Sequence, residues 1–257
     1  MNKNKILKIL TGSLIISVIL FSSLVSLYKD RNEIIFWLKN KNPFSDYDNK
    51  KHSNKEDIIW SKKIMEGGYI LHFRHAERDK WIDVQMYDSL ESDVHNNGKN
   101  GTRFAENDYF SKAVCLNDRG LIQAQAIGEH LSNIKFPIGF VISSPSCRSR
   151  QTANISFGGY DELYRILVHS GPYNEDEKKR ISKLTKLYMN LPIHSGTNTI
   201  VSAHNSVVHS DMFENMNNKD IKLEEGGFYV ISKKNGKLYL EHEFHNFRNF
   251  IKTFYER

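Results

Sequence analysis

From residue 69 onward, short apolar runs alternate with stretches whose apolar side chains recur at helical spacing. Four apolar runs have the length of buried strands, and they cover residues 69–74, 139–144, 163–170 and 198–204. Three further stretches predict helices, over residues 116–134, 147–157 and 175–191. Asn117 is a suitable amino-terminal cap for the first of these helices. Near the carboxyl terminus, residues 227–244 predict a β-hairpin that turns at Asn235-Gly236, a strong type I′ signal.

Strands that alternate with helices predict a mostly parallel sheet with helices on both faces. We therefore expect an α/β fold, a three-layer α/β/α sandwich, preceded by one amino-terminal transmembrane helix. In such sheets, ligands bind beyond the carboxyl ends of the strands. The polar residues that directly follow the apolar runs are thus the first candidates for a functional site.

The amino terminus has the pattern of a membrane anchor. Residues 1–8 contain three lysines, and residues 9–28 contain no charged side chain. Twenty helical residues extend over ~30 Å, about the thickness of the hydrocarbon core of a bilayer. The end of this run matches a signal-peptidase site poorly, so an uncleaved anchor is favoured over a signal peptide. The sequence predicts a single-pass protein of the inner or plasma membrane, with a cytoplasmic tail (residues 1–8) and the folded domain outside the cytoplasm.

The rest of the chain divides into a connecting segment and one domain. Residues 29–60 are expected to form a juxtamembrane helix and a tether, because residues 40–55 are rich in Asn, Asp, Lys and Ser. The folded domain then covers residues 61–257. Within it, residues 79–115 have an irregular pattern and several aromatic side chains. They predict a lid-like insertion that selects the substrate, although core packing explains these aromatic side chains nearly as well.

The net charge of +6 first suggests a nucleic-acid partner, but its distribution argues against one. Residues 1–63 contain 12 Lys and Arg against 6 Asp and Glu, whereas residues 64–257 contain 24 of each. A basic leader on a neutral body is more typical of contact with a membrane surface. The chain also contains no zinc-finger, helix-turn-helix or RNA-binding pattern. We therefore expect membrane association through the amino-terminal helix and no nucleic-acid partner.

Arginines and histidines follow three of the predicted strands. Arg74 and His75 end the first strand, and Arg148 follows the second. His204 and Asn205 follow the fourth. Buried cations are unfavourable unless a negative charge compensates them, and either a carboxylate of the fold or an anionic ligand supplies that charge. Because the three strand ends meet at one edge of a parallel sheet, the pattern favours a ligand that carries negative charge.

Four sequence blocks resemble the signature motifs of the histidine phosphatase superfamily, which includes phosphoglycerate mutases and many phosphatases. They are RHAER from Arg74, LNDRGLIQA from Leu116, SSPSCRSRQTA from Ser143 and VSAHNS from Val201. Each block alone is a weak signal, but the four occur in the family's order over residues 69–232. Within the superfamily, the chain is most similar to short anchored or exported phosphatases that act on envelope polysaccharide or lipopolysaccharide phosphates.

The resemblance implies a phosphoryl-transfer site for a phosphorylated small molecule or glycan, and this site needs neither a metal nor a cofactor. It assigns His75 as the nucleophile that becomes phosphohistidine, with its other ring nitrogen bonded to a backbone carbonyl. It implies that Arg74 and Arg148 bind the phosphate oxygens as paired donors. His204 would stabilise the charge that builds up in the transition state.

Four further residues have less certain roles. Glu175 lies 27 residues after Arg148 and is the candidate general acid, or else it merely begins the next helix. Arg78 either adds a third cation to the substrate site or pairs with an acidic residue on the surface. Asn205 either contacts the phosphate or caps the helix that follows His204. Glu77 belongs to the signature and is expected to brace the loop.

Cys115 and Cys147 are the only cysteines. In an exported domain they either pair or remain as two separate buried thiols, and both interpretations stay open. The resemblance places both segments beside the phosphate pocket, where a disulfide would help to hold Arg148.

The leading functional hypothesis is a membrane-anchored phosphatase that hydrolyses phosphomonoesters through a phosphohistidine intermediate, on envelope polysaccharide or lipopolysaccharide phosphates. The alternative is a non-catalytic module of the same fold that binds phosphorylated sugars. The sequence carries no signal for an oligomeric state.

Overall fold

The structure is a computed structural model, and it describes residues 55–79, 114–168, 176–216 and 222–255. The predicted anchor at residues 9–28 and most of the predicted lid-like insertion lie outside the described residues. Within the described part of the chain, no helix is both long and apolar enough to cross a bilayer.

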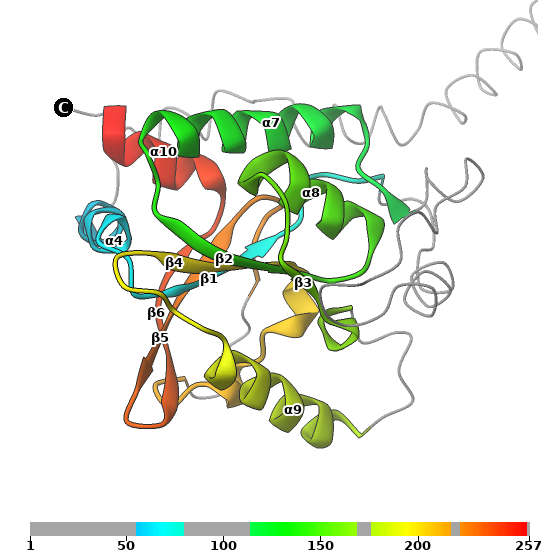
Figure 1. Cartoon of the computed structure of the whole chain (residues 1–257), viewed down its shortest axis with the longest axis vertical. Helices are drawn as coiled ribbons and strands as arrows, with labels where there is room; N and C mark the ends of the chain where they lie inside the picture. The colour runs from blue at the N-terminus through cyan, green and yellow to red at the C-terminus, as the bar shows by residue number, and fades with distance from the viewer. Residues whose placement is uncertain (1–54, 80–113, 169–175, 217–221, 256–257) are drawn as a thin grey trace, which may run out of the picture. The chain divides into compact units, whose positions relative to one another are not determined.

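A six-stranded mixed sheet forms the centre of the domain, in the order β3-β2-β4-β1-β5-β6 (Figure 1). The strands are β1 (Ile70–Arg74), β2 (Ile138–Ser143), β3 (Glu162–Leu163), β4 (Asn198–Ala203), β5 (Phe228–Lys234) and β6 (Lys237–Phe244). The first four of these are parallel to one another, and β5 and β6 are antiparallel additions at one side. The predicted hairpin is confirmed, and Asn235 and Gly236 at its turn both have positive φ, as a type I′ turn requires.

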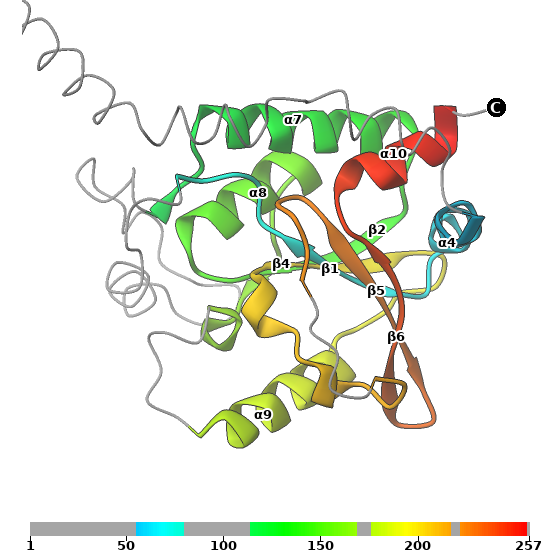
Figure 2. The ribbon, with the colours of Figure 1, turned by 180° about the vertical axis from the view of Figure 1, so that it is seen from behind.

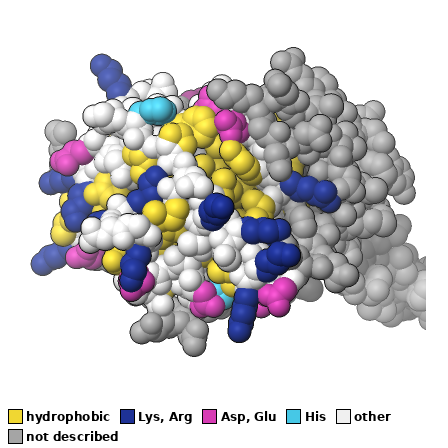
Figure 3. Space-filling view, turned by 60° about the horizontal axis from the view of Figure 1, so that its bottom comes forward, with side chains coloured by type: hydrophobic (Ala, Val, Ile, Leu, Met, Phe, Trp, Pro, Cys, Tyr) yellow, Lys and Arg dark blue, Asp and Glu magenta, His cyan; other side chains and the backbone are white. Residues whose placement is uncertain are grey.

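Helices lie on both sides of the sheet (Figures 1 and 2). The five helices in the described ranges are α4 (Lys55–Met65), α7 (Asp118–Asn133), α8 (Cys147–Phe157), α9 (Glu177–Asn190) and α10 (Phe247–Tyr255). In the views of Figures 1 and 2, α7, α8 and α10 cover one face and α9 the other. Asn117 caps α7 as predicted, because its side chain accepts a hydrogen bond from the backbone N–H of Gly120. On the side that carries α9, lysines and arginines lie among hydrophobic side chains (Figure 3).

The prediction of a strand over residues 163–170 is largely wrong. Only Glu162 and Leu163 pair with β2, and a 3₁₀ turn follows at Arg165–Leu167. The pairing stops there because β2 ends at Ser143, which is the partner of Leu163, so no neighbouring strand continues alongside. Apolar character alone does not make a strand where no partner backbone is available.

Two helices at the ends of the domain were not predicted. Helix α4 begins at Lys55 and crosses residue 60, the expected end of the tether, and its Trp60 and Ile64 are buried in the domain. Helix α10 buries Phe247 and Phe250 on one face. The two helices contact each other, and Thr253 of α10 donates a hydrogen bond to Ser61 of α4.

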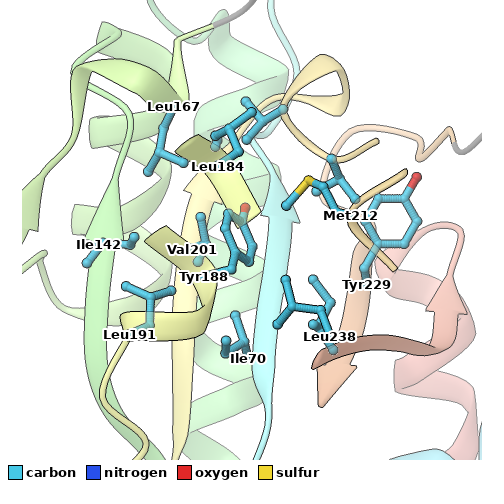
Figure 4. Packing of buried hydrophobic residues seen from close by; sticks show 14 of the residues in the cluster. Ile70, Ile142, Leu167, Leu184, Tyr188, Leu191, Val201, Met212, Tyr229 and Leu238 are labelled. Carbon is cyan, nitrogen blue, oxygen red and sulfur yellow. The ribbon is translucent and has the colours of Figure 1, made fainter. Parts of the chain in front are cut away.

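The core consists of two clusters of buried side chains. One contains the side chains that α9 packs onto the sheet, including Leu184, Tyr188 and Val201 (Figure 4). The other is rich in aromatic rings, with Phe73 stacked on Phe228 at 4.5 Å between ring centroids. Together they hold the parallel strands in a fixed register, so the residues that follow the strands take fixed positions.

Candidate active site

The two histidines of the predicted site follow neighbouring parallel strands. Arg74 pairs with Ala203 in the β1–β4 register, so His75 and His204 are the next residues on the two strands. The backbone N–H of His75 donates to the carbonyl of Ala203 at 3.0 Å, which extends the ladder by one bond. The two imidazole rings are 5.1 Å apart between centroids and lie edge to face. The sheet therefore brings both histidines to one edge, as predicted.

His75 is buried, and one of its ring nitrogens keeps the lone pair that a nucleophile needs. Its Nδ1 lies 2.7 Å from the backbone carbonyl of Ala76, and because a carbonyl only accepts, Nδ1 carries the hydrogen. The lone pair is then on Nε2. Burial, followed by the positive charge of Arg148, holds the pKa of His75 well below its usual value, with smaller effects of Arg74 and Arg78 in the same direction. The imidazole is thus neutral at physiological pH, the form that a nucleophile requires.

Arg148 in the first turn of α8 connects the two histidines. Its Nε lies 3.2 Å from Nε2 of His75, and its Nη2 lies 3.5 Å from Nδ1 of His204. Its Nη1 is 3.3 Å from the carbonyl of Val114, and the side chain is buried. The predicted residues Arg148, His75 and His204 therefore form one cluster.

His204 is also held by two serines whose role the sequence did not indicate. The hydroxyls of Ser144 and Ser146 each lie 3.2 Å from Nε2 of His204. Both serines belong to the segment between β2 and α8, within the block that supplied Arg148. The sequence indicated these serines only through their position in the same motif block as Arg148.

The compensating charge for Arg74 comes from the fold, which corrects the expectation that a ligand supplies it. Glu225 accepts from Nη2 of Arg74 at 2.8 Å, and the carbonyl of Leu223 accepts from Nη1 at 2.6 Å. Glu225 lies 151 residues away in sequence and precedes β5, so no local pattern connected the two residues. This ion pair fixes the guanidinium of Arg74, which is close enough to His75 to help lower the pKa of that residue.

Asn205 has a role that neither prediction for it described. Its side-chain amide donates to the carbonyl of Leu223 at 2.9 Å and accepts from the N–H of Leu223 at 3.0 Å. Leu223 is the residue whose carbonyl accepts from Arg74. Asn205 therefore holds Leu223 in place, and the carbonyl of Leu223 in turn helps to orient Arg74.

Of the three remaining predicted residues, the structure describes Arg78 and Glu77. Arg78 donates to the backbone carbonyl of Asp79 at 2.8 Å, and it is close enough to His75 to lower the pKa of that residue. Glu77 accepts from Nε of Arg119 at 2.8 Å, which matches its expected role as a brace. Glu175, the candidate general acid, lies outside the described residues.

Cys115 and Cys147 form a disulfide, with their Cα atoms 4.8 Å apart. Of the two interpretations of the cysteines, the structure has the paired one. Cys147 immediately precedes Arg148, and Cys115 follows Val114, whose carbonyl accepts from Arg148. The bridge thus joins the two segments that position this arginine.

The described residues contain no group of three or more His, Cys, Asp or Glu side chains arranged to hold a metal ion. The cluster around His75 is instead made of imidazoles, guanidiniums and hydroxyls. Such groups are suited to bind an oxyanion.

A family model described as the histidine phosphatase superfamily (branch 1) matches residues 108–165. These residues include the start of α7 and the segment that carries Arg148. Over this segment the chain matches the histidine phosphatase superfamily. The match and the cluster of His75, Arg148 and His204 identify a histidine-type phosphatase.

Several solved structures are similar to this histidine phosphatase. One is the product of the open reading frame Rv3214 from Mycobacterium tuberculosis, with 15% identity over 68% of this chain and 96% of that chain, at a TM-score of 0.43. The protein histidine phosphatase SixA complexed with tungstate has 14% identity over 68% and 96%, at a TM-score of 0.44. A phosphoserine phosphatase from Entamoeba histolytica, in complex with 3-phosphoglyceric acid, has 14% identity over 68% and 95%, at a TM-score of 0.41. No curated protein sequence matches the chain.

Proposed function

We propose that this histidine phosphatase hydrolyses phosphomonoesters through a phosphohistidine intermediate on His75. The observation that carries the proposal is the state of the His75 ring. Its Nδ1 donates to the Ala76 carbonyl, and its Nε2 lies beside the Arg148 guanidinium. Burial and the nearby positive charges keep the ring neutral by lowering its pKa. A buried neutral imidazole next to fixed cations is suited to attack a phosphoryl group that those cations also attract.

In the first step, the Nε2 lone pair of His75 attacks phosphorus. The nitrogen–phosphorus bond forms while the bond from phosphorus to the leaving oxygen breaks, and that oxygen takes a proton. In the second step, water attacks the phosphorus and gives one proton to the group that protonated the leaving oxygen. The nitrogen–phosphorus bond breaks, its electron pair returns to Nε2 of His75, and inorganic phosphate leaves. Arg148 and Arg74 bind the phosphoryl oxygens, and His204 stabilises the charge in both transition states.

The proton for the leaving oxygen comes from Glu175 in this proposal. Glu175 directly precedes Asp176, the amino-terminal cap of α9. If Glu175 is the acid, esters with poor leaving groups depend on it, whereas p-nitrophenyl phosphate depends on it little, because its phenolate leaves without a proton.

We further propose that residues 9–28 anchor the enzyme in the inner or plasma membrane with the domain outside the cytoplasm. The support is the uncharged run of 20 residues behind a lysine-rich tail. A phosphatase held at that place meets phosphorylated envelope glycans, so polysaccharide or lipopolysaccharide phosphates are the proposed substrates.

The deciding experiment measures hydrolysis of p-nitrophenyl phosphate by the purified full chain and traps the intermediate with ³²P-labelled substrate. We expect turnover, inhibition by vanadate, and a protein-bound label that is stable in base and lost in acid. Tight vanadate binding without turnover would instead favour the phosphate-sugar binding module.

The location is tested separately, by fusing alkaline phosphatase to the carboxyl terminus. That enzyme is active only outside the cytoplasm, so an active fusion in the membrane fraction supports the anchor. An inactive but intact fusion contradicts it.

A further inference from the structure

A buried chain of two hydrogen bonds leads from α9 to the backbone of His204. The hydroxyl of Tyr188 lies 2.6 Å from Nδ1 of His72, and Nε2 of His72 lies 3.1 Å from the carbonyl oxygen of His204. Tyr188 is on α9, His72 on β1, and His204 directly follows β4. The side chains of Tyr188 and His72 are both fully buried. Figure 4 shows Tyr188 within the buried cluster that α9 packs onto the sheet.

The partners leave His72 one arrangement of its ring hydrogen. A carbonyl oxygen only accepts, so Nε2 of His72 must donate to His204. Nδ1 is then the acceptor, and the Tyr188 hydroxyl donates to it. Burial lowers the pKa of His72 to about 3 and raises the pKa of Tyr188 well above its usual value, so both groups stay neutral at physiological pH.

The carbonyl of His204 lies where the backbone ladder between β1 and β4 has ended. The last bond of that ladder joins the N–H of His75 to the carbonyl of Ala203. The next carbonyl, that of His204, accepts from the N–H of Val207 at 3.2 Å and from the His72 ring. A carbonyl has two lone pairs, and these two bonds use both. The His72 ring thus supplies a hydrogen bond to His204 at the point where the backbone bonds between β1 and β4 have ended.

We propose that His72 and Tyr188 are positioning residues that set the backbone of His204 and thereby aim its imidazole at the phosphoryl group. This inference rests on the proposed function. Both residues act through the backbone of His204, so we assign them no part in bond making or breaking. The pair, which we call the Tyr188–His72 relay, connects a helix on the far side of the sheet to the site.

Two substitutions of His72 separate the donated hydrogen bond from the volume of the ring. In His72→Gln, the side-chain amide places an N–H close to the position of the imidazole Nε2–H and retains the donor. His72→Leu keeps a buried side chain of similar size and removes the donor. Thr199→Val is the matched control, because Thr199 is buried near the opposite end of β4 and donates to the carbonyl of Pro192.

We expect His72→Leu to lower kcat for p-nitrophenyl phosphate by about 10-fold, the effect of one lost bond to a buried carbonyl expressed at the transition state. Inhibition by vanadate should weaken by a similar factor, with KM changed by less than about 3-fold. His72→Gln should stay within about 3-fold of the wild type in kcat, and Thr199→Val should not lower kcat beyond that. Equal loss in the Gln and Leu variants, or equal loss in Thr199→Val, would overturn the relay. If His72→Leu does not fold, Tyr188→Phe must lower kcat more than Thr199→Val does, or the relay is wrong.

A second readout does not depend on turnover and so separates this inference from the proposed function. In ¹⁵N-histidine NMR of the full chain, the His72 ring should show a protonated Nε2 and an unprotonated Nδ1, unchanged from pH 5 to 8. The ring signals of His204 should shift in His72→Leu and remain near their wild-type positions in His72→Gln. A His72 ring protonated on Nδ1, or His204 signals that do not respond to His72→Leu, would contradict the relay even in an active enzyme. If the wild type fails to hydrolyse phosphomonoesters while these NMR results hold, only the proposed function fails.

Discussion

The Nε atom of Arg148 lies 3.2 Å from Nε2 of His75. This Nε2 carries the lone pair of the ring, because the hydrogen is on Nδ1, which donates to the Ala76 carbonyl. The guanidinium thus covers the lone pair that the proposed reaction uses. A phosphoryl oxygen that binds to the guanidinium would bring phosphorus to the same place. The arrangement combines a nucleophile with the cation that attracts its target.

The first prediction concerns this nucleophile. His75→Asn should abolish hydrolysis of p-nitrophenyl phosphate and the acid-labile label, because an amide nitrogen does not form the phosphoryl intermediate. Label trapping and steady-state kinetics measure both effects. His194→Asn is the control, since His194 is exposed and lies between α9 and β4, at the end of β4 that is away from His204. Full activity in His75→Asn would end the phosphatase mechanism.

The second prediction concerns Arg148. Arg148→Lys keeps a positive charge but loses the planar fork that reaches His75, His204 and Val114 together. We expect kcat/KM to fall by about 10²–10³, comparable to ~2.7–4 kcal/mol for one oxyanion donor. Arg119→Lys, on an exposed side chain, should change kcat/KM by less than about 3-fold. A loss in Arg148→Lys no larger than in Arg119→Lys would show that the guanidinium is not needed.

Most elements that position the site were predictable from the sequence. The runs that end in Arg74 and Ala203 are apolar and short, and a parallel sheet brings such ends together whatever the distance in sequence. The bond from His75 to the Ala76 carbonyl was predictable too, because a nucleophilic imidazole needs its other nitrogen occupied.

The residues that the sequence missed are those whose role depends on contacts between distant segments. Glu225 reaches Arg74 from the loop before β5, and Ser144 is adjacent to His204 only once β2 and β4 have paired. His72 is a buried residue of an apolar strand, but its donation to His204 depends on the end of β4. Such contacts come from tertiary packing, and hydrophobic patterns carry no information on them.

The third prediction is that activity is independent of metal ions. In the described part of the chain, the site consists of imidazoles, guanidiniums and hydroxyls, and no three His, Cys, Asp or Glu side chains are arranged to hold a metal ion. Extensive dialysis against EDTA should leave kcat unchanged. A loss that Zn²⁺ or Mg²⁺ restores would contradict the proposed mechanism, and a metal-dependent alkaline phosphatase treated in parallel verifies that chelation was effective.

The fourth prediction concerns the pH dependence of stability through His72. Burial lowers the pKa of this residue to about 3 in the folded state, against about 6.5 when unfolded. Below pH 6.5 the unfolded chain therefore binds a proton that the folded chain does not. The resulting stability is complete above pH 6.5, and it is lost as the pH falls toward 3, with a slope of up to ~1.4 kcal/mol per pH unit.

Urea unfolding at several pH values, compared between wild type and His72→Gln, isolates this contribution, because the other titrating groups are common to both. The free energy of unfolding of the wild type should fall more steeply than that of the variant between pH 6 and 4. The two should run parallel above pH 7. Parallel curves over the whole range would mean that the pKa of His72 is the same in the folded and the unfolded protein, which contradicts the prediction.

The last prediction concerns the disulfide between Cys115 and Cys147. The bridge closes a loop between residues 32 apart in sequence, which corresponds to ~3–4 kcal/mol in the chain-entropy account of disulfide stabilisation. The two segments are also joined by the bond from Arg148 to the Val114 carbonyl and by one from the Leu116 N–H to Gln151 at 2.7 Å. The bridge therefore supports contacts that position the guanidinium.

Substituting both cysteines by serine should lower the free energy of unfolding by about that amount, measured by urea titration. It should also lower kcat, because Arg148 loses the fixed position of its neighbours. Reductant should produce both effects in the wild type and neither in the double variant, which serves as the control for other actions of the reductant. Mass spectrometry after alkylation checks the bond itself. Two alkylated thiols in protein that has not been reduced would show that the cysteines are not bonded, and unchanged kcat in the double variant would show that the bridge does not position Arg148.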